Sequence, residues 1–296
     1  MDNAKPRWTT SSYLLYAGGL IVLFAALGAL AYLSSQYGDA AYAGWAALVL
    51  VVLSGLGIAL KRAGRWLAAG VFGFASVIAW AAFVGALWAW FGWLHGASSG
   101  FPFSGFSVAR LSFELLVLGA VFDDMRRYRF PFIAAIGVFV GWLFVTDLIS
   151  GGGSWSAVVS LFVGLAYFVV GLVSDKPSAF WFHVAAGALI GGSLVYWWHA
   201  GDTSWSLVAV ASLVYVLIAE RTHRSSWAVF GTIGFLATAI HFAAEWSSGP
   251  LVLSPALLSD FRGWVPPLVF AFVGFLLVVL GLYARRRNPV PAPLAE

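Results

Sequence analysis

Long runs of apolar residues, separated by short polar turns, make up almost the whole chain. Most of these runs approach the roughly 20 residues that a helix needs to cross a bilayer. The run at 205–219 is short, so it would have to be accommodated by local adjustment of the bilayer. The pattern predicts an all-α polytopic membrane protein, a single transmembrane domain over residues 1–296. Its ten predicted spans are residues 12–34, 42–60, 65–93, 106–122, 131–149, 155–174, 179–199, 205–219, 227–246 and 264–284.

The composition supports lipid as the solvent of this chain. Hydrophobic residues make up 61% of it and charged residues 9%, whereas soluble domains carry about 25% charged residues. The first run is longer than a signal-peptide core of about 7–15 residues, so we expect a retained helix. The chain has no cysteine, which excludes disulfides, thiolate metal sites and cysteine nucleophiles. The Pro-rich segment 285–296 is predicted to be a disordered cytoplasmic tail.

The positive charges predict an orientation. If the spans alternate in direction, every Lys and Arg except Arg110 and Arg262 falls on the side that holds the N-terminus. By the positive-inside rule, both termini are then cytoplasmic and the protein lies in the plasma or inner membrane. The basic residues therefore indicate topology and not a nucleic-acid partner. The expected partners are the lipid bilayer, a small-molecule solute, and a membrane protein or a second copy of the chain.

Two sequence similarities indicate an internal repeat. The segment SWSAVVSLFVG at 154–164 resembles SWSLVAVASLV at 204–214, and residues 65–80 resemble 226–241 with the same Trp, Gly and Phe spacing. Because each repeating unit would contain two spans, successive units keep the same orientation. The pattern predicts four parallel helical hairpins, flanked by the first and last spans. Most of the 16 tryptophans lie near predicted span ends, as in an interfacial belt, with ligand stacking as the alternative.

Two pairs of ionisable residues stand out within the spans. Arg110 and Glu114 are four residues apart, as are His241 and Glu245, so each pair shares one face of its helix. Counted from the outer span ends, Glu114 lies roughly 12 Å deep and His241 roughly 8 Å. We therefore predict a ladder in which Glu114 faces His241 and Arg110 faces Glu245. Asp147, at the outer end of its span, is either a further member or a turn residue.

These residues allow a structural and a functional interpretation. In the structural one, Arg110 and Glu245 reach the lipid headgroups and His241 bonds to a neighbouring helix. In the functional one, they line a cavity open to the outside, where Arg110 binds an anion and Glu114 and His241 exchange protons. They are therefore the candidate binding or proton-coupling residues.

The remaining features carry less chemistry. His95, His199 and Asp202 lie at outer span ends or in turns, and His183 is expected to be a structural histidine. The sequence has no HExxH, GxSxG or Walker motif and no lysine inside a span. We accordingly predict no catalytic residues, no metal site and no cofactor.

Three functions are compatible with this sequence. The first is a small-solute transporter or permease with a site near the outer face, favoured by the number of spans, the repeat and the embedded charges. The second is a non-catalytic membrane subunit or scaffold, which suits the short loops. The third is a membrane-embedded enzyme acting on a lipid-linked substrate at the outer leaflet, with Glu114 and His241 as base and acid.

Overall fold

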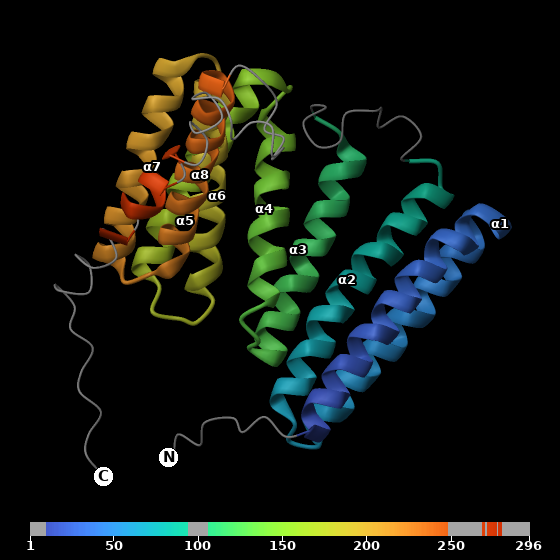
Figure 1. The fold of residues 1–296 in the computed structure, drawn as a ribbon. Helices are drawn as coiled ribbons and strands as arrows, with labels where there is room; N and C mark the ends of the chain where they lie inside the picture. Colours follow the sequence, from blue (N-terminus) through green and yellow to red (C-terminus); the bar gives the residue numbers. More distant parts are fainter. Residues whose placement is uncertain (1–9, 94–105, 248–267, 270, 277, 280–296) are drawn as a thin grey trace, which may run out of the picture. The chain divides into compact units, whose positions relative to one another are not determined.

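The computed structural model describes the chain except for residues 1–9, 94–105, 248–267, 270, 277 and 280–296 (Figure 1). Every regular element among the described residues is an α-helix. The chain divides into two compact units, and each is considered by itself. Unit 1 comprises Met1–Val159 with Lys176–Trp181, and unit 2 comprises Ser160–Asp175 with Phe182–Glu296.

Unit 1 is a row of helices that pack on one another in chain order (Figure 1). They are α1 (Thr10–Arg62), α2 (Trp66–Trp90), α3 (Val108–Tyr128) and α4 (Ile133–Ile149). Helix α1 is interrupted at Gly38, whose φ of 76° and ψ of 179° are not helical. Glycine adopts a positive φ without the steric penalty of a side chain. The kink lies between the predicted spans 12–34 and 42–60, which are therefore two helical segments joined without a loop.

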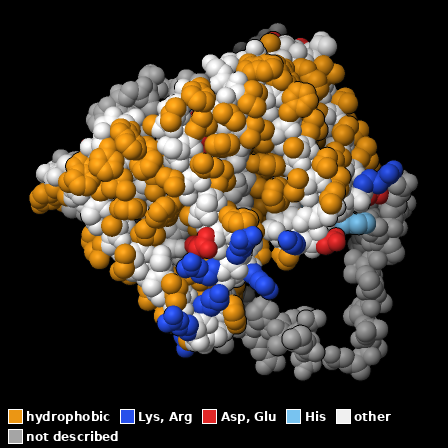
Figure 2. All heavy atoms as spheres, turned by 180° about the vertical axis from the view of Figure 1, so that it is seen from behind, with side chains coloured by type: hydrophobic (Ala, Val, Ile, Leu, Met, Phe, Trp, Pro, Cys, Tyr) orange, Lys and Arg blue, Asp and Glu red, His pale blue; other side chains and the backbone are white. Residues whose placement is uncertain are grey.

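The basic turns of unit 1 lie at the same end of its helices. The Lys61 Nζ atom, at the end of α1, donates a hydrogen bond of 2.7 Å to the carbonyl oxygen of Arg127 near the end of α3. The C-cap residue of α3 is Arg129, which adopts a left-handed conformation with φ of 51°. Figure 2 shows Lys and Arg side chains gathered at the edge of a largely hydrophobic surface. This distribution is typical of helices whose sides meet lipid and whose ends meet water.

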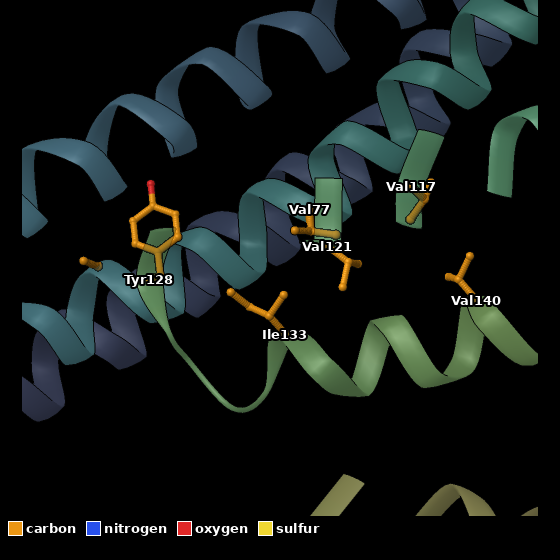
Figure 3. Close-up of a cluster of buried hydrophobic side chains, with 7 residues drawn as sticks. Val77, Val117, Val121, Tyr128, Ile133 and Val140 are labelled. Atoms are coloured by element: carbon orange, nitrogen blue, oxygen red, sulfur yellow. The ribbon is translucent and has the colours of Figure 1, made fainter. Parts of the chain in front are cut away.

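The core of unit 1 lies between α2, α3 and α4. Figure 3 shows valines from all three helices gathered with Tyr128 and Ile133, and Ile133 is fully buried. Two glycines of α2 allow the close approach of the α3–α4 turn. A Cβ atom on Gly70 would lie 2.6 Å from the Phe130 ring, and one on Gly73 would collide with Tyr128. Small residues at such contacts are a common means of packing helices in membranes.

Unit 2 is built from the remaining helices. They are α5 (Gly153–Val173) from Ser160 onward, α6 (Ala179–Trp198), α7 (Asp202–Thr222) and α8 (Ser225–Ser247). Its core forms around Trp227, which is 1% exposed and packs edge-on against Phe168 and Tyr215. The Trp227 Nε1–H donates a hydrogen bond of 3.1 Å to Nδ1 of His183, which is also buried. His183 therefore has the structural surroundings that we expected.

Six helices among the described residues are long and apolar enough to cross a membrane. They are Gln36–Arg62 of α1, α2, α5, α6, α7 and Ser225–Glu245 of α8. The protein is therefore an integral membrane protein. Helix α7 is longer than its predicted span 205–219, while α4 is apolar but short. The predicted span 264–284 lies largely outside the described residues, and the count of ten spans, the repeat and the orientation stay predictions.

Candidate functional site

Three of the five candidate residues come together inside unit 1. Arg110 and Glu114 lie one turn apart near the start of α3, and Asp147 lies near the end of α4. Because α3 and α4 form an antiparallel hairpin, the start of one helix lies beside the end of the other. Arg110 Nε is 3.6 Å from Asp147 Oδ2. The cluster lies at the end of these helices opposite the basic turns.

The cluster is shielded from the surroundings of unit 1. The exposed fractions of Arg110, Glu114 and Asp147 are 5%, 1% and 0%. Charged residues reach such burial almost only when they are paired. An ion pair in this environment lacks the screening that weakens a pair at the surface. The cluster therefore has strong electrostatic interactions and a high cost if its single guanidinium is removed.

Helix α2 braces the start of α3 beside this cluster. The Trp88 Nε1–H donates to the carbonyl oxygen of Ala109 at 3.0 Å and to Ser112 Oγ at 3.3 Å. The carbonyl of Ala109 also accepts a hydrogen bond of 2.9 Å from Ser112 Oγ. These contacts hold the first turn of α3, which carries Arg110. Sequence reasoning assigned Trp88 no role.

The charges within the cluster do not balance. Two carboxyl groups, those of Glu114 and Asp147, face a single guanidinium, that of Arg110. Both carboxyl oxygens of Glu114 are buried, and the side chain of Asp147 is the hydrogen-bonding neighbour of this carboxyl group. A buried charge without compensation costs several kcal/mol in a membrane protein, roughly 2.5–3.5 on insertion scales. The cluster therefore requires one more positive charge, and a proton held between the two carboxyl groups would supply it.

Polar residues continue from Asp147 into the turn before α5. The hydroxyl groups of Ser150 and Ser156 are hydrogen-bonded to each other, and both residues are buried. The backbone N–H of Gly152 also donates to Ser150 Oγ at 3.3 Å. This hydrogen-bonded pair lies at the turn between α4 and α5, where Gly151 is exposed.

The other two candidate residues lie in unit 2 in a more open environment. His241 Nε2 is 3.0 Å from Asp202 Oδ1, and these side chains are 21% and 57% exposed. The His241 ring stacks on Trp205 with centroids 5.0 Å apart and planes 16° from parallel. Glu245, one turn further along α8, is exposed. This pair joins the start of α7 to the end of α8 and has the character of a surface contact.

The predicted ladder between the two charge pairs stays a prediction. Arg110 and Glu114 belong to unit 1, whereas His241 and Glu245 belong to unit 2. Within its own unit, each pair lies beside an aspartate of the neighbouring helix. Arg110 lies beside Asp147, and His241 lies beside Asp202. Sequence reasoning weighed Asp147 for the cluster but placed Asp202 at the interface without a partner. The predicted hairpins could have identified both aspartates. In each hairpin, the aspartate lies at the same end as the charge pair on the other helix.

The remaining histidines play no part in either cluster within the described structure. His199 Nδ1 lies 2.6 Å from the carbonyl oxygen of Tyr196 at the exposed end of α6. His95 lies outside the described residues.

Comparison of the chain with protein families, curated proteins and solved structures gives no match. The function therefore has to be argued from the residues of the site, because a fold alone does not determine an activity. The buried cluster of Arg110, Glu114 and Asp147 is the part of the described structure in which the arrangement of ionisable groups goes beyond what packing requires.

Proposed function

We propose that this integral membrane protein transports a small solute and couples that transport to protons through Glu114. The single observation that carries the proposal is the burial of two carboxyl groups, those of Glu114 at 1% and Asp147 at 0% exposure, beside a single guanidinium. A cluster held only for stability would be expected to balance its charges, because a buried charge without compensation is costly.

The charge balance explains how the cluster would carry a proton. With one proton on the two carboxyl groups, the remaining carboxylate neutralises Arg110 and the buried cluster has no net charge. Once that proton leaves, Glu114 and Asp147 compete for a single guanidinium, and the extra negative charge favours entry of water or of a cationic group. Release of the proton and opening of the site are therefore coupled by electrostatics.

Arg110 and Asp147 have distinct roles in this proposal. Asp147 is the carboxyl group closest to Arg110, with 3.6 Å between Nε and Oδ2, and it holds the guanidinium in the closed state. Glu114 lies one helical turn deeper along α3 and exchanges the proton. An anionic solute group that reached the site would replace Asp147 as the partner of Arg110, since guanidinium groups bind carboxylates and phosphates strongly.

The two alternative functions make less use of this arrangement. A scaffold has no need of a second buried acid, because an ion pair of Arg110 with Asp147 alone would be simpler. An enzyme at the outer leaflet, with Glu114 and His241 as base and acid, would need these two residues to meet around one substrate. The transporter proposal rests on unit 1 alone and requires no such meeting.

Proton movement in proteoliposomes tests the proposal. The wild-type protein is reconstituted with a pH-sensitive dye inside, an outward potassium gradient is made conductive with valinomycin, and a panel of small anionic and neutral solutes is added in turn. We expect at least one solute to cause acidification of the lumen, and Glu114→Gln to abolish it. The control is Asp123→Asn, which removes an exposed acid from the opposite end of the same helix. Acidification that survives in Glu114→Gln, or that no solute produces, would overturn the proposal.

A further inference from the structure

A groove in unit 2 lies away from the charged cluster. It is formed by α6, α7 and α8 and has a volume of about 360 Å³, within the range of about 300–1,000 Å³ that is common for small-molecule sites. The residues that line it lie in the middle of these three helices, and each helix is long and apolar enough to span a membrane. The residues that line it are Gly187, Ala188, Gly191, Gly192, Leu194, Val195, Val208, Ala211, Ser212, Tyr215, Phe230, Ile233 and Gly234.

Glycines create this groove by leaving out side chains on one face of α6. A Cβ atom added to Gly187 would lie 2.5 Å from the ring of Phe230, and one added to Gly191 would lie 3.2 Å from the Tyr215 hydroxyl. These two positions therefore form a closed floor. A Cβ atom added to Gly192 would meet nothing within 4 Å, so this position borders open space.

The polar atoms of the groove are already paired. The Ser212 hydroxyl donates to the carbonyl oxygen of Val208 at 2.8 Å, and the Tyr215 hydroxyl donates to that of Gly187 at 2.9 Å. The other lining side chains are apolar, and the lining contains no charged residue. A polar solute would lose its hydrogen bonds to water here without gaining new ones, which disfavours its binding. The occupant that suits this lining is a hydrocarbon.

The mouth of the groove opens sideways from the helices of unit 2. Ala188, Gly192 and Ile233 line it and are exposed, with Ile233 at 54%, whereas Val208 and Tyr215 on its floor are buried. An exposed position in the middle of a spanning helix faces the hydrocarbon core of the bilayer. The groove is therefore open at the depth where phospholipid acyl chains lie.

From this lining and depth, we infer that the groove binds one acyl chain of a membrane phospholipid. The volume of about 360 Å³ and the open space beside Gly192 accommodate an unbranched chain. The headgroup would remain at the membrane surface, because the lining offers it no charged or unpaired polar partner. This inference is independent of the proton-coupled transport proposed above and uses none of the residues of the charged cluster.

Photolabelling in a bilayer tests this inference. The full chain is reconstituted into vesicles of phosphatidylethanolamine and phosphatidylglycerol that contain a trace of phosphatidylcholine with a diazirine near the middle of one acyl chain. After irradiation and digestion, labelled residues are mapped by mass spectrometry. We expect labelling of the groove to exceed that of other exposed apolar positions, and Gly192→Phe to reduce groove labelling about tenfold, equivalent to 1.4 kcal/mol of affinity.

A matched control separates filling of the groove from a general effect of a new aromatic residue. Gly119→Phe adds the same side chain to α3, where Gly119 is exposed and a Cβ atom meets nothing within 4 Å. It should leave groove labelling unchanged. If Gly192→Phe does not fold, Ala188→Leu at the mouth is used instead. Uniform labelling of all exposed positions, labelling that persists in the filled variant, or cross-linking of residues 264–284 into the groove would each overturn the inference.

Discussion

Replacement of Arg110 by methionine isolates the electrostatics of the buried cluster. Methionine keeps the length and the apolar stem of the side chain but removes the guanidinium, which lies 3.6 Å from Asp147 Oδ2. Both carboxyl groups of the cluster then lose the guanidinium that faces them. Because neither Glu114 nor Asp147 is more than 1% exposed, water in the folded state does little to compensate for the loss. We therefore expect a large decrease in the free energy of unfolding.

The size of this decrease follows from the geometry. Two unit charges 3.6 Å apart attract by about 4–5 kcal/mol at an effective dielectric constant of about 20. Removal of one partner from a buried ion pair typically costs about 3–5 kcal/mol, because it leaves an uncompensated charge. We expect Arg110→Met to fall in this range. Glu114→Gln should change stability by about 1 kcal/mol or less, since glutamine can still hydrogen-bond to Asp147 and the variant removes the carboxyl group that exceeds the single guanidinium.

Equilibrium unfolding in mixed micelles, with the denaturing detergent increased stepwise, measures these changes. The 16 tryptophans provide the fluorescence signal. The double variant Arg110→Met/Asp147→Asn completes a cycle, and its cost should be smaller than the sum of the single costs by about 0.5–3 kcal/mol.

Two results would refute this reasoning. A cost below about 1 kcal/mol for Arg110→Met would indicate a solvated pair of the kind found at protein surfaces. A cost for Glu114→Gln as large as that for Arg110→Met would indicate that the Glu114 carboxylate is a stabilising partner of Arg110, so the cluster would lack the charge imbalance on which the transport proposal depends.

Two further predictions concern the packing of each unit. Gly70→Ala should destabilise unit 1 by about 1–3 kcal/mol through overpacking, since the new Cβ atom would lie 2.6 Å from the Phe130 ring; Gly119→Ala, where nothing lies within 4 Å, should instead stabilise by up to about 1 kcal/mol. Trp227→Phe should cost about 1–3 kcal/mol because it leaves the buried Nδ1 of His183 without its donor. Detergent unfolding measures both, and equal effects at the two glycines would contradict the packing argument.

The hydrophobic pattern predicted most of the helices closely. Predicted spans such as 179–199 and 227–246 correspond to α6 (Ala179–Trp198) and α8 (Ser225–Ser247). Composition is informative here because a helix in lipid must satisfy its backbone within itself and present apolar side chains outward. The junction of the first two spans was less predictable. Residues between them continue the helix up to and beyond Gly38, because the polar residues of this stretch are compatible with helix formation.

The predicted repeat illustrates what a pattern of small residues leaves open. It aligns Gly70 and Gly73 of α2 with Gly231 and Gly234 of α8, and all four are positions where a Cβ atom would meet a neighbouring side chain. The neighbours differ, however. The glycines of α2 meet the end of α3 and the turn after it, which follow in the chain, and those of α8 meet α7, which precedes it. Sequence thus identifies a face for close packing, but the helix that packs there depends on the whole arrangement.

The two charge pairs show a similar limit and explain why one of them is the better functional candidate. A spacing of four residues places Arg110 with Glu114, and His241 with Glu245, on one helix face, but it does not specify what covers that face. The start of α3 is covered by α4, so a charge balance has to be met without water. His241 lies in the open, where its pairing with an exposed aspartate is worth about 0–1 kcal/mol. Only a buried charge imbalance can make proton binding and opening of the site depend on each other. For that reason the transport experiment begins with Glu114 on α3.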